Sequence, residues 1–221
     1  MSKSDMQILV VEKNALFGSN GEYFFEGFRP HHELDYESRI LANLESMRRG
    51  SVDEDANHPE GNAERNSGYK QPIGYMLIVN PNTKKVFAYQ RSSDNEKYME
   101  KRLQGKWSWG VGGHIEAQDT KGNPIQESTL RELKEEVEFK GEILGEPKVL
   151  GYIYHDFDVH KVHFGILYLI ETNEEVEPRD PEISHGKFMD LNELEKICFS
   201  NNCEVEEWSK TAIKPLKDYF Q

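Results

Sequence analysis

The chain has 221 residues and a formal net charge of −13 at pH 7, from 40 acidic and 27 basic side chains. So acidic a surface is a poor partner for duplex nucleic acid, because such binding depends on Lys and Arg neutralising phosphates. The longest apolar runs, residues 73–79 and 164–170, are too short to span a membrane, so no membrane association is expected.

The N-terminal region is predicted to be an extension of a single catalytic domain. Residues 7–11 are typical of a short strand, and residues 33–49 carry a stripe of apolar side chains at helical spacing. The stripe comprises Leu34, Ile40, Leu41, Leu44 and Met47. It needs a partner surface, either the catalytic core or a second subunit in a homodimer. Residues 51–71 contain almost no apolar groups and are expected to be a loop or a partly disordered connection. We therefore expect an extension over residues 1–70, packed on a core over residues 71–221.

The core is predicted to combine strands with helices. Two apolar runs flank Asn80-Pro81-Asn82-Thr83-Lys84, an arrangement that is typical of a hairpin. Asn123 and Pro124 suit the N-cap and the first position of a helix that should reach about Glu138. Strands are expected at residues 73–79, 85–91, 148–154 and 162–171, and further helices at residues 192–197 and 209–220. Strands surrounding a central helix predict a mixed sheet in an α/β/α sandwich.

The central helix is predicted to carry three carboxylates on one face. Glu132, Glu135 and Glu136 stand at positions i, i+3 and i+4, so their Cβ atoms should lie about 5 to 6 Å apart. Each pair repels by about 3 kcal/mol at an effective dielectric near 20, which favours a cation among them. Hard divalent ions such as Mg²⁺ and Mn²⁺ prefer oxygen ligands and are the expected cofactor. The alternative is an ordinary exposed helix face of an acidic protein.

Together with the glycines before it, this helix resembles the box of the Nudix hydrolases, G-x5-E-x7-R-E-(aliphatic)-x-E-E-x-G-(aliphatic). The matching positions are Gly113, Arg131, Glu132, Leu133, Glu135 and Glu136. The resemblance covers roughly residues 70–195, because the segments around Trp107 and Phe188 look like flanks that are common in the family. It implies the family's α/β/α sandwich, with a mixed sheet and a central catalytic helix.

The first half of the box departs from the family pattern. Asp119 stands where the box has its first Glu, and eleven residues rather than seven separate it from Arg131. Alternatively, the loop absorbs the extra residues elsewhere, and Glu116 or Glu127 does the work of that Glu. Glu138 replaces the Gly that follows the glutamate pair. The half that shapes the loop is thus altered, while the half that holds metal is intact.

The resemblance implies metal-dependent hydrolysis of a diphosphate linkage in a small substrate, a nucleoside diphosphate linked to some moiety X. One or more Mg²⁺ or Mn²⁺ ions would be held by Glu132, Glu135 and Glu136, with the carbonyl of Gly113. Such ions neutralise phosphate charge, position the attacking water and lower its pKa. Arg131 would hold the carboxylates so that they point at the metal. Catalytic roles are therefore expected for Glu135 and Arg131.

The resemblance also points to a general base. In many members of the family a Glu in a loop before the final helix has this role, and Glu182 matches that position by its distance from Lys187 and Phe188. His185, His155 and His163 are alternatives.

Aromatic residues near the box are candidates for binding the base of a nucleotide. Trp107 and Trp109 are expected to contact the substrate, as is Arg91, and Tyr89 is a further candidate for stacking. The alternative for these rings is core packing, which is common for aromatic side chains beside strands.

Two other classes of function remain. A non-catalytic nucleotide-binding or sensing module is consistent with the altered half of the box. A diphosphate isomerase of the same fold would use a catalytic Cys in the core, whereas Cys198 and Cys203 lie late in the chain. These cysteines also lack the spacing of metal ligands, so we expect reduced thiols in a cytoplasmic protein.

Overall fold

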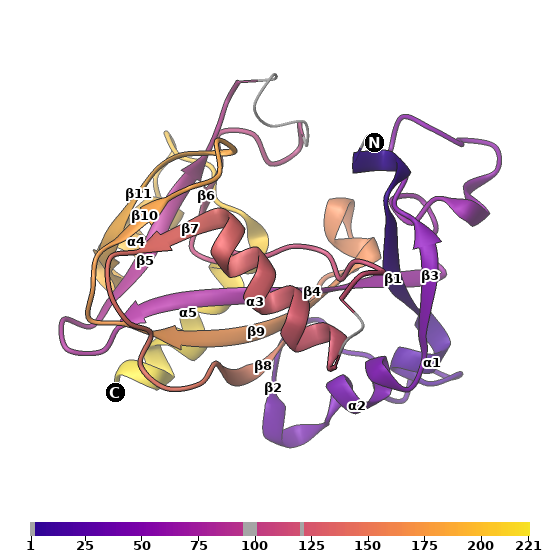
Figure 1. The fold of residues 1–221 in the computed structure, drawn as a ribbon, viewed down its shortest axis with the longest axis horizontal. Helices are drawn as coiled ribbons and strands as arrows, with labels where there is room; N and C mark the ends of the chain where they lie inside the picture. The colour runs from indigo at the N-terminus through magenta and orange to yellow at the C-terminus, as the bar shows by residue number, and fades with distance from the viewer. Residues whose placement is uncertain (1–2, 95–100, 120–121) are drawn as a thin grey trace. The chain divides into compact units, whose positions relative to one another are not determined.

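The structure, a computed structural model, describes residues 3–94, 101–119 and 122–221 (Figure 1). Its contacts divide the chain into two compact units. Unit 1 comprises Met1–Gly74, Gly113–Leu130 and Gly151–Ile166, and unit 2 comprises Tyr75–Gly112, Arg131–Leu150 and Leu167–Gln221. Within the described ranges, no helix combines the length and hydropathy that crossing a lipid bilayer requires.

Unit 1 is built around an antiparallel pairing near the N-terminus. Strand β1 (Gln7–Glu12) pairs with β3 (Leu44–Arg48) along its length and with the start of β4 (Tyr69–Asn80) at Val11 and Glu12. Strand β2 (Gly27–Pro30) pairs with the end of β8 (Lys148–Tyr154).

The core of unit 1 contains a group of aromatic rings from separate elements. The short helices α1 (Lys13–Phe17) and α2 (Tyr36–Leu41) contribute two of them. The group comprises Phe17, Phe25, Tyr36, Tyr152, Tyr154 and Phe164. Burial of so many large rings makes the N-terminal segment an integral part of this unit.

Unit 2 contains the hairpin that the sequence predicts. Strand β5 (Lys85–Arg91) pairs with the end of β4, and the intervening turn is closed by a hydrogen bond of 3.0 Å from the Thr83 N–H to Asn80 Oδ1. Lys84 has a positive φ of 52°, as a tight turn requires. On its other side β5 pairs with β11 (Ile183–Asp190) and with the short β6 (Trp107–Ser108).

The central helix α3 (Pro124–Glu136) begins in unit 1 and ends in unit 2. The remaining elements of unit 2 follow it in the chain. Strand β7 (Val137–Phe139) pairs with β10 (Val176–Pro178), and β9 (His163–Glu171) runs from unit 1 into unit 2. Helix α4 (Leu191–Cys198) begins with a capping box between Asp190 and Glu193. The C-terminal helix is α5 (Glu207–Phe220).

The expected α/β class with a mixed sheet and several helices is confirmed, and most elements lie where the sequence predicts them. The predicted helix over residues 33–49 is wrong. Only Tyr36–Leu41 is α-helical, and the Asn43 side chain donates a hydrogen bond of 2.8 Å to the Arg39 carbonyl at its end. Leu44–Arg48 instead forms β3, because its backbone pairs with β1. Sheet pairing overrode a helical spacing of apolar residues.

The segment predicted as a loop, residues 51–71, is mostly irregular, but it is not a bare connection. Asn62, Ala63 and Glu64 are buried in unit 1, and β4 begins at Tyr69. The compact units also divide the chain differently from a boundary at residue 70, because unit 1 joins the N-terminal segment to residues 113–130 and 151–166.

Candidate active site and metal-binding residues

Helix α3 begins as the sequence predicts and lies against strand β4 (Figure 1). Asn123 Oδ1 accepts hydrogen bonds from the N–H groups of Ile125 and Gln126, at 3.0 and 3.4 Å, so Asn123 is the N-cap. Gly74 in β4 permits the close approach, because a Cβ at this position would lie 2.4 Å from Thr129 Oγ1. The helix ends at Glu136 rather than at Glu138.

The last turns of α3 carry the box residues. Arg131 Nη1 donates hydrogen bonds to Glu132 Oε1 at 2.7 Å and to Glu135 Oε2 at 3.3 Å. Arg131 and Glu132 are largely buried, whereas the Glu135 side chain is 55% exposed. Arg131 therefore contacts two of the three carboxylates, as a residue that holds ligands in place would.

Glu136 has a different environment from the other two glutamates. Its Oε2 atom is buried and has no hydrogen-bond partner among the residues that the structure describes. Burial raises the pKa of Glu136 from 4.5 to about 8; Arg91 opposes this increase, and the charges of Glu132, Asp180 and Glu182 add to it. A carboxylate in this position gains stability from a nearby cation.

The segment before β11 is attached to the end of α3. The N–H groups of Arg179 and Asp180 both donate to the Glu136 carbonyl, at 2.8 and 3.2 Å. Asp180 Oδ1 in turn accepts from the Glu182 N–H at 2.7 Å, and the Glu182 carbonyl accepts from the Ser92 N–H at 2.7 Å. This hydrogen-bonded loop brings Glu182 into the electrostatic environment of the box helix.

Arg91 lies at the end of β5 and forms an ion pair that is nearly closed to solvent. Its Nε atom is 2.7 Å from Glu206 Oε1, and the two side chains are 11% and 5% exposed. Because Arg91 also lowers the pKa of Glu136, its charge acts on the box helix as well. The role expected for Arg91 in substrate binding stays a prediction.

The two tryptophans differ in accessibility. Trp107 is half-buried and meets the exposed His185 edge to face, with 5.3 Å between ring centroids. Trp109 is fully buried, as is Tyr89, whose hydroxyl donates to the Gly110 carbonyl at 2.7 Å. Rings without solvent exposure cannot stack on a ligand in this conformation, so Trp109 and Tyr89 fit the core-packing alternative and Trp107 is the ring open to a ligand.

The glycine-containing loop of the box lies in unit 1, where Gly113 precedes the loop that carries Asp119. Asp119 is buried, and its Oδ2 accepts from the Glu116 N–H at 2.8 Å, which makes it a turn-forming residue here. Glu116 accepts a hydrogen bond of 2.6 Å from the Gln118 side chain. The Glu127 carboxylate packs beside Gly122 in the first turn of α3.

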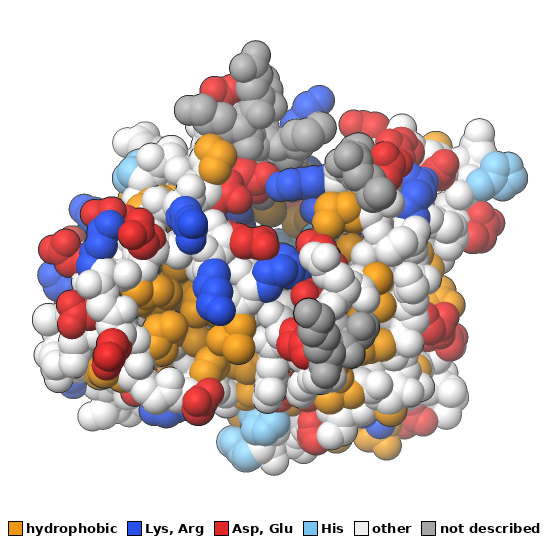
Figure 2. Space-filling view, viewed as in Figure 1, with side chains coloured by type: hydrophobic (Ala, Val, Ile, Leu, Met, Phe, Trp, Pro, Cys, Tyr) orange, Lys and Arg blue, Asp and Glu red, His pale blue; other side chains and the backbone are white. Residues whose placement is uncertain are grey.

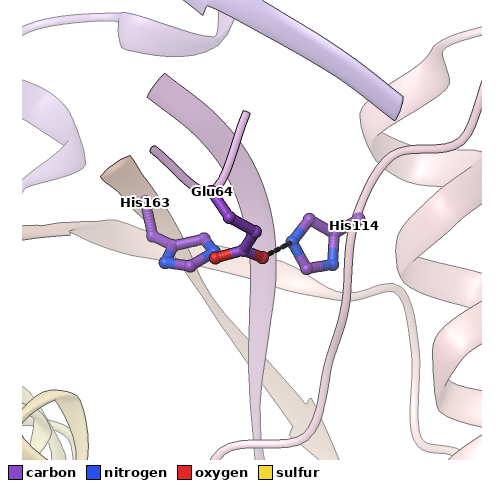
Figure 3. Close-up of side chains that lie close together, drawn as sticks. All are labelled: Glu64, His114 and His163. Atoms are coloured by element: carbon purple, nitrogen blue, oxygen red, sulfur yellow. Dashed lines mark ion pairs between the residues drawn. The ribbon is translucent and has the colours of Figure 1, made fainter. Parts of the chain in front are cut away.

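A group of potential metal ligands that sequence reasoning missed lies in unit 1. Glu64, His114 and His163 each offer a ligand atom, and these atoms all lie within 4.8 Å of one another (Figure 3). In the described parts of the chain this is the one such set of three, so the glutamates of α3 do not converge as closely. The sequence suggests His163 only as an alternative base. The three residues are too far apart in the chain to form a metal-binding motif. His155 lies apart from them, with Nδ1 3.5 Å from Glu26.

Acidic and basic side chains are interspersed on the face of the protein that Figure 2 displays. Ion pairs such as Arg48–Glu54 and Lys140–Glu177 join basic and acidic side chains.

Comparisons with known proteins agree with the box. The family model described as "NUDIX domain" matches residues 70–207, while no curated protein matches the chain. Tm1382, named as a candidate Nudix hydrolase, superposes with a TM-score of 0.67 at 24% identity, covering 97% of this chain and 100% of its own.

Two more distant solved structures share the fold. The NUDIX domain of NrtR from Shewanella oneidensis, solved with ADP-ribose, has a TM-score of 0.51 at 13% identity and covers 69% of this chain and 89% of its own. The corresponding values for the NUDIX hydrolase from Alicyclobacillus acidocaldarius are 0.52, 13%, 66% and 90%. Because the family model spans more than half of the chain and these structures share its fold, the chain belongs to the Nudix family.

Proposed function

We propose that the protein hydrolyses the diphosphate linkage of a nucleoside diphosphate joined to a moiety X. The observation that carries this proposal is the end of α3, where Arg131 contacts Glu132 and Glu135 while a buried Glu136 oxygen has no hydrogen-bond partner in the described part of the chain. Carboxylates gathered at a helix end suit charge-dense phosphate chemistry once a cation joins them.

The donor set of the helix fits a hard divalent ion. Glu132, Glu135 and Glu136 offer only oxygen atoms, which Mg²⁺ and Mn²⁺ prefer, and the unsatisfied Glu136 oxygen favours a positive charge. The Gly113 carbonyl is the further ligand that we propose. When bound, the ion neutralises phosphate charge and lowers the pKa of a coordinated water.

We propose that Glu182 accepts the proton of the attacking water. Its loop is hydrogen-bonded to the end of α3 through Asp180, which supports this role. We propose that Trp107, which is half-buried beside His185, stacks on a base. Arg91 supplies a fixed positive charge near the carboxylates.

A substrate panel tests the proposed reaction. We expect cleavage into a nucleoside monophosphate and a second phosphorylated product, separated by chromatography, from at least one of nucleotide sugars, ADP-ribose, dinucleoside polyphosphates, dinucleotide cofactors and nucleoside triphosphates, with Mg²⁺ or Mn²⁺ and not with a chelator. ADP-ribose belongs in the panel because the similar NUDIX domain of NrtR was solved with it. Failure of every substrate with both ions would refute the hydrolase. We further propose a cytoplasmic location, in keeping with the free cysteines Cys198 and Cys203.

A nucleotide-binding or sensing module is the second candidate. The observation that favours it is the pair of hydrogen bonds that occupies Glu132 and Glu135 with Arg131, together with the lengthened loop before the helix. Calorimetric titration of the same panel separates the two functions. A sensor would bind a nucleotide without turnover in either metal ion.

A further inference from the structure

The Glu64–His114–His163 cluster is assembled from three separate segments of unit 1. Glu64 precedes β4, His114 forms an isolated bridge with Ile73 of that strand, and His163 is the first residue of β9. The side chains point toward one another in Figure 3. Glu64 and His163 are each 9% exposed, so the donor atoms meet in a largely dry environment.

Contacts outside the cluster orient the His163 ring and fix the backbone of Glu64. His163 Nδ1 is 2.7 Å from the Val159 carbonyl. Since a carbonyl oxygen only accepts, Nδ1 carries the proton and Nε2 keeps its lone pair. The backbone of Glu64 is fixed because its N–H donates to the Arg49 carbonyl at 3.1 Å. The His114 and His163 rings meet edge to face, with 5.5 Å between centroids.

The separation of Glu64 from His114 is longer than a direct hydrogen bond and suits a shared ion. Glu64 Oε1 and His114 Nε2 are 4.0 Å apart, beyond the 2.7 to 3.2 Å range of a nitrogen–oxygen hydrogen bond. Two ligands on a tetrahedral Zn²⁺ with bonds of about 2.0 to 2.1 Å lie roughly 3.4 Å apart. For this pair, a shift of less than 1 Å therefore gives the separation of two ligands on one ion.

We propose that Glu64, His114 and His163 form a site for a divalent transition-metal ion, with Zn²⁺ as the ion that their chemistry favours. Two imidazoles and one carboxylate are borderline ligands, unlike the oxygen-only set of α3, and three protein ligands leave a coordination position open to water or a small anion. The site uses none of the residues assigned to diphosphate hydrolysis, so it goes beyond the proposed function.

Arg49 is the natural competitor of this ion. Its Nε atom lies 3.5 Å from Glu64 Oε1 and neutralises the carboxylate when no metal is bound. A guanidinium and a divalent cation repel each other at this distance. The Arg49 side chain is 28% exposed and can turn toward solvent, so its removal should strengthen metal binding.

Metal analysis of the full chain tests the proposal. Chelator-stripped protein is dialysed against Zn²⁺ in excess Mg²⁺, which occupies oxygen-only sites, and bound zinc is measured by atomic spectroscopy. We expect the wild-type chain to retain a single Zn²⁺, and His114→Ala and His163→Ala to lose it. His160→Gln is the matched control, because His160 is also 9% exposed but lies outside the cluster.

A second variant keeps the test decisive if the histidine variants do not fold. Arg49→Gln should bind Zn²⁺ at least about tenfold more tightly than the wild-type chain, because a competing charge is gone. Substitution with Co²⁺ gives a visible spectrum that reports imidazole and carboxylate ligands in the same variants. Equal zinc content in folded His163→Ala, or no change in affinity in Arg49→Gln, would overturn the site.

Discussion

The carboxylate face of α3 and the Glu64–His114–His163 cluster are both ionisable groups in partly buried surroundings, but they are assembled differently. Residues of the first are at most four positions apart in the chain, and helical geometry alone brings them together. Residues of the second come from positions 64, 114 and 163, and only folding unites them. The α3 carboxylates form a recognisable motif because they are close in the sequence. The Glu64–His114–His163 cluster is tighter in space but has no sequence motif.

The two groups also differ in how their negative charges are neutralised. The α3 glutamates are partly neutralised by Arg131, and the buried Glu136 carries an elevated pKa. The unit 1 cluster balances one carboxylate with Arg49 and two imidazoles, which are neutral ligands when unprotonated. The first therefore suits a hard cation beside phosphate, and the second suits a borderline transition metal.

The largest effect should come from neutralising the α3 carboxylates. Glu135→Gln and Glu136→Gln should each abolish most metal-dependent turnover, because an amide keeps the shape but removes the charge that a hard cation needs. Steady-state rates at saturating Mg²⁺ measure the loss. Zinc retention by unit 1 should not change in these variants, which provides the internal control. Wild-type rates in both variants would show that α3 does not hold the catalytic metal.

The next effect concerns the stability of unit 1. Deleting residues 1–70 removes β1 and Glu64, and the remaining chain should be insoluble or much less stable. Ile8→Ala is a milder version and should cost about 2 to 4 kcal/mol of unfolding free energy, because Ile8 is 1% exposed. Denaturant unfolding measures both. A soluble and fully active deletion variant would mean that the N-terminal segment is an independent accessory.

Removal of the proposed base should act on the chemical step. Glu182→Gln should lower kcat by roughly 10²- to 10⁴-fold and change KM little. His185→Ala is made in parallel, because His185 lies in the same strand region beside Trp107. If Glu182→Gln has normal kcat while His185→Ala is crippled, the base is His185. Normal rates in both would exclude this loop from the chemistry.

The smallest effect is the pH dependence of stability without metal. The folded pKa of Glu136 is about 8 and its ordinary value is 4.5, so the folded state holds a proton that the unfolded state releases between these values. Unfolding free energy should therefore fall as pH rises from about 4.5 to 8, and Glu136→Gln should reduce this slope. Denaturant titrations of chelated protein across this range provide the measurement.

Adding Mg²⁺ to the same denaturant titrations tests whether a cation binds at the end of α3. It should restore stability above pH 7 in the wild-type chain and have less effect in Glu136→Gln, because the ion compensates the buried negative charge. A wild-type stability that is independent of pH and of Mg²⁺ would contradict a cation site at the end of α3. Burial is the main cause of the raised pKa of Glu136, and the charges of Glu132, Asp180 and Glu182 add to it.

Many elements could be predicted because they carry local signals. Asn123 and Pro124 mark the start of α3, and a turn sequence marks the β4–β5 hairpin. The predicted helix over residues 33–49 failed for the opposite reason. Its apolar spacing fits a helix, but residues 44–48 pair with β1 in a sheet. Nothing in the local sequence of residues 44–48 indicates that β1 is their partner.

The sequence by itself determined the Nudix box, the order of its charges on one helix face and the chemistry of oxygen ligands, because a helix converts spacing directly into geometry. Tertiary structure alone decided that Trp109 is buried while Trp107 stays accessible, that Glu136 loses solvent, and that Glu64 meets two histidines. Burial and long-range contact depend on which segments pack together, and packing is a property of the whole chain rather than of any short stretch within it.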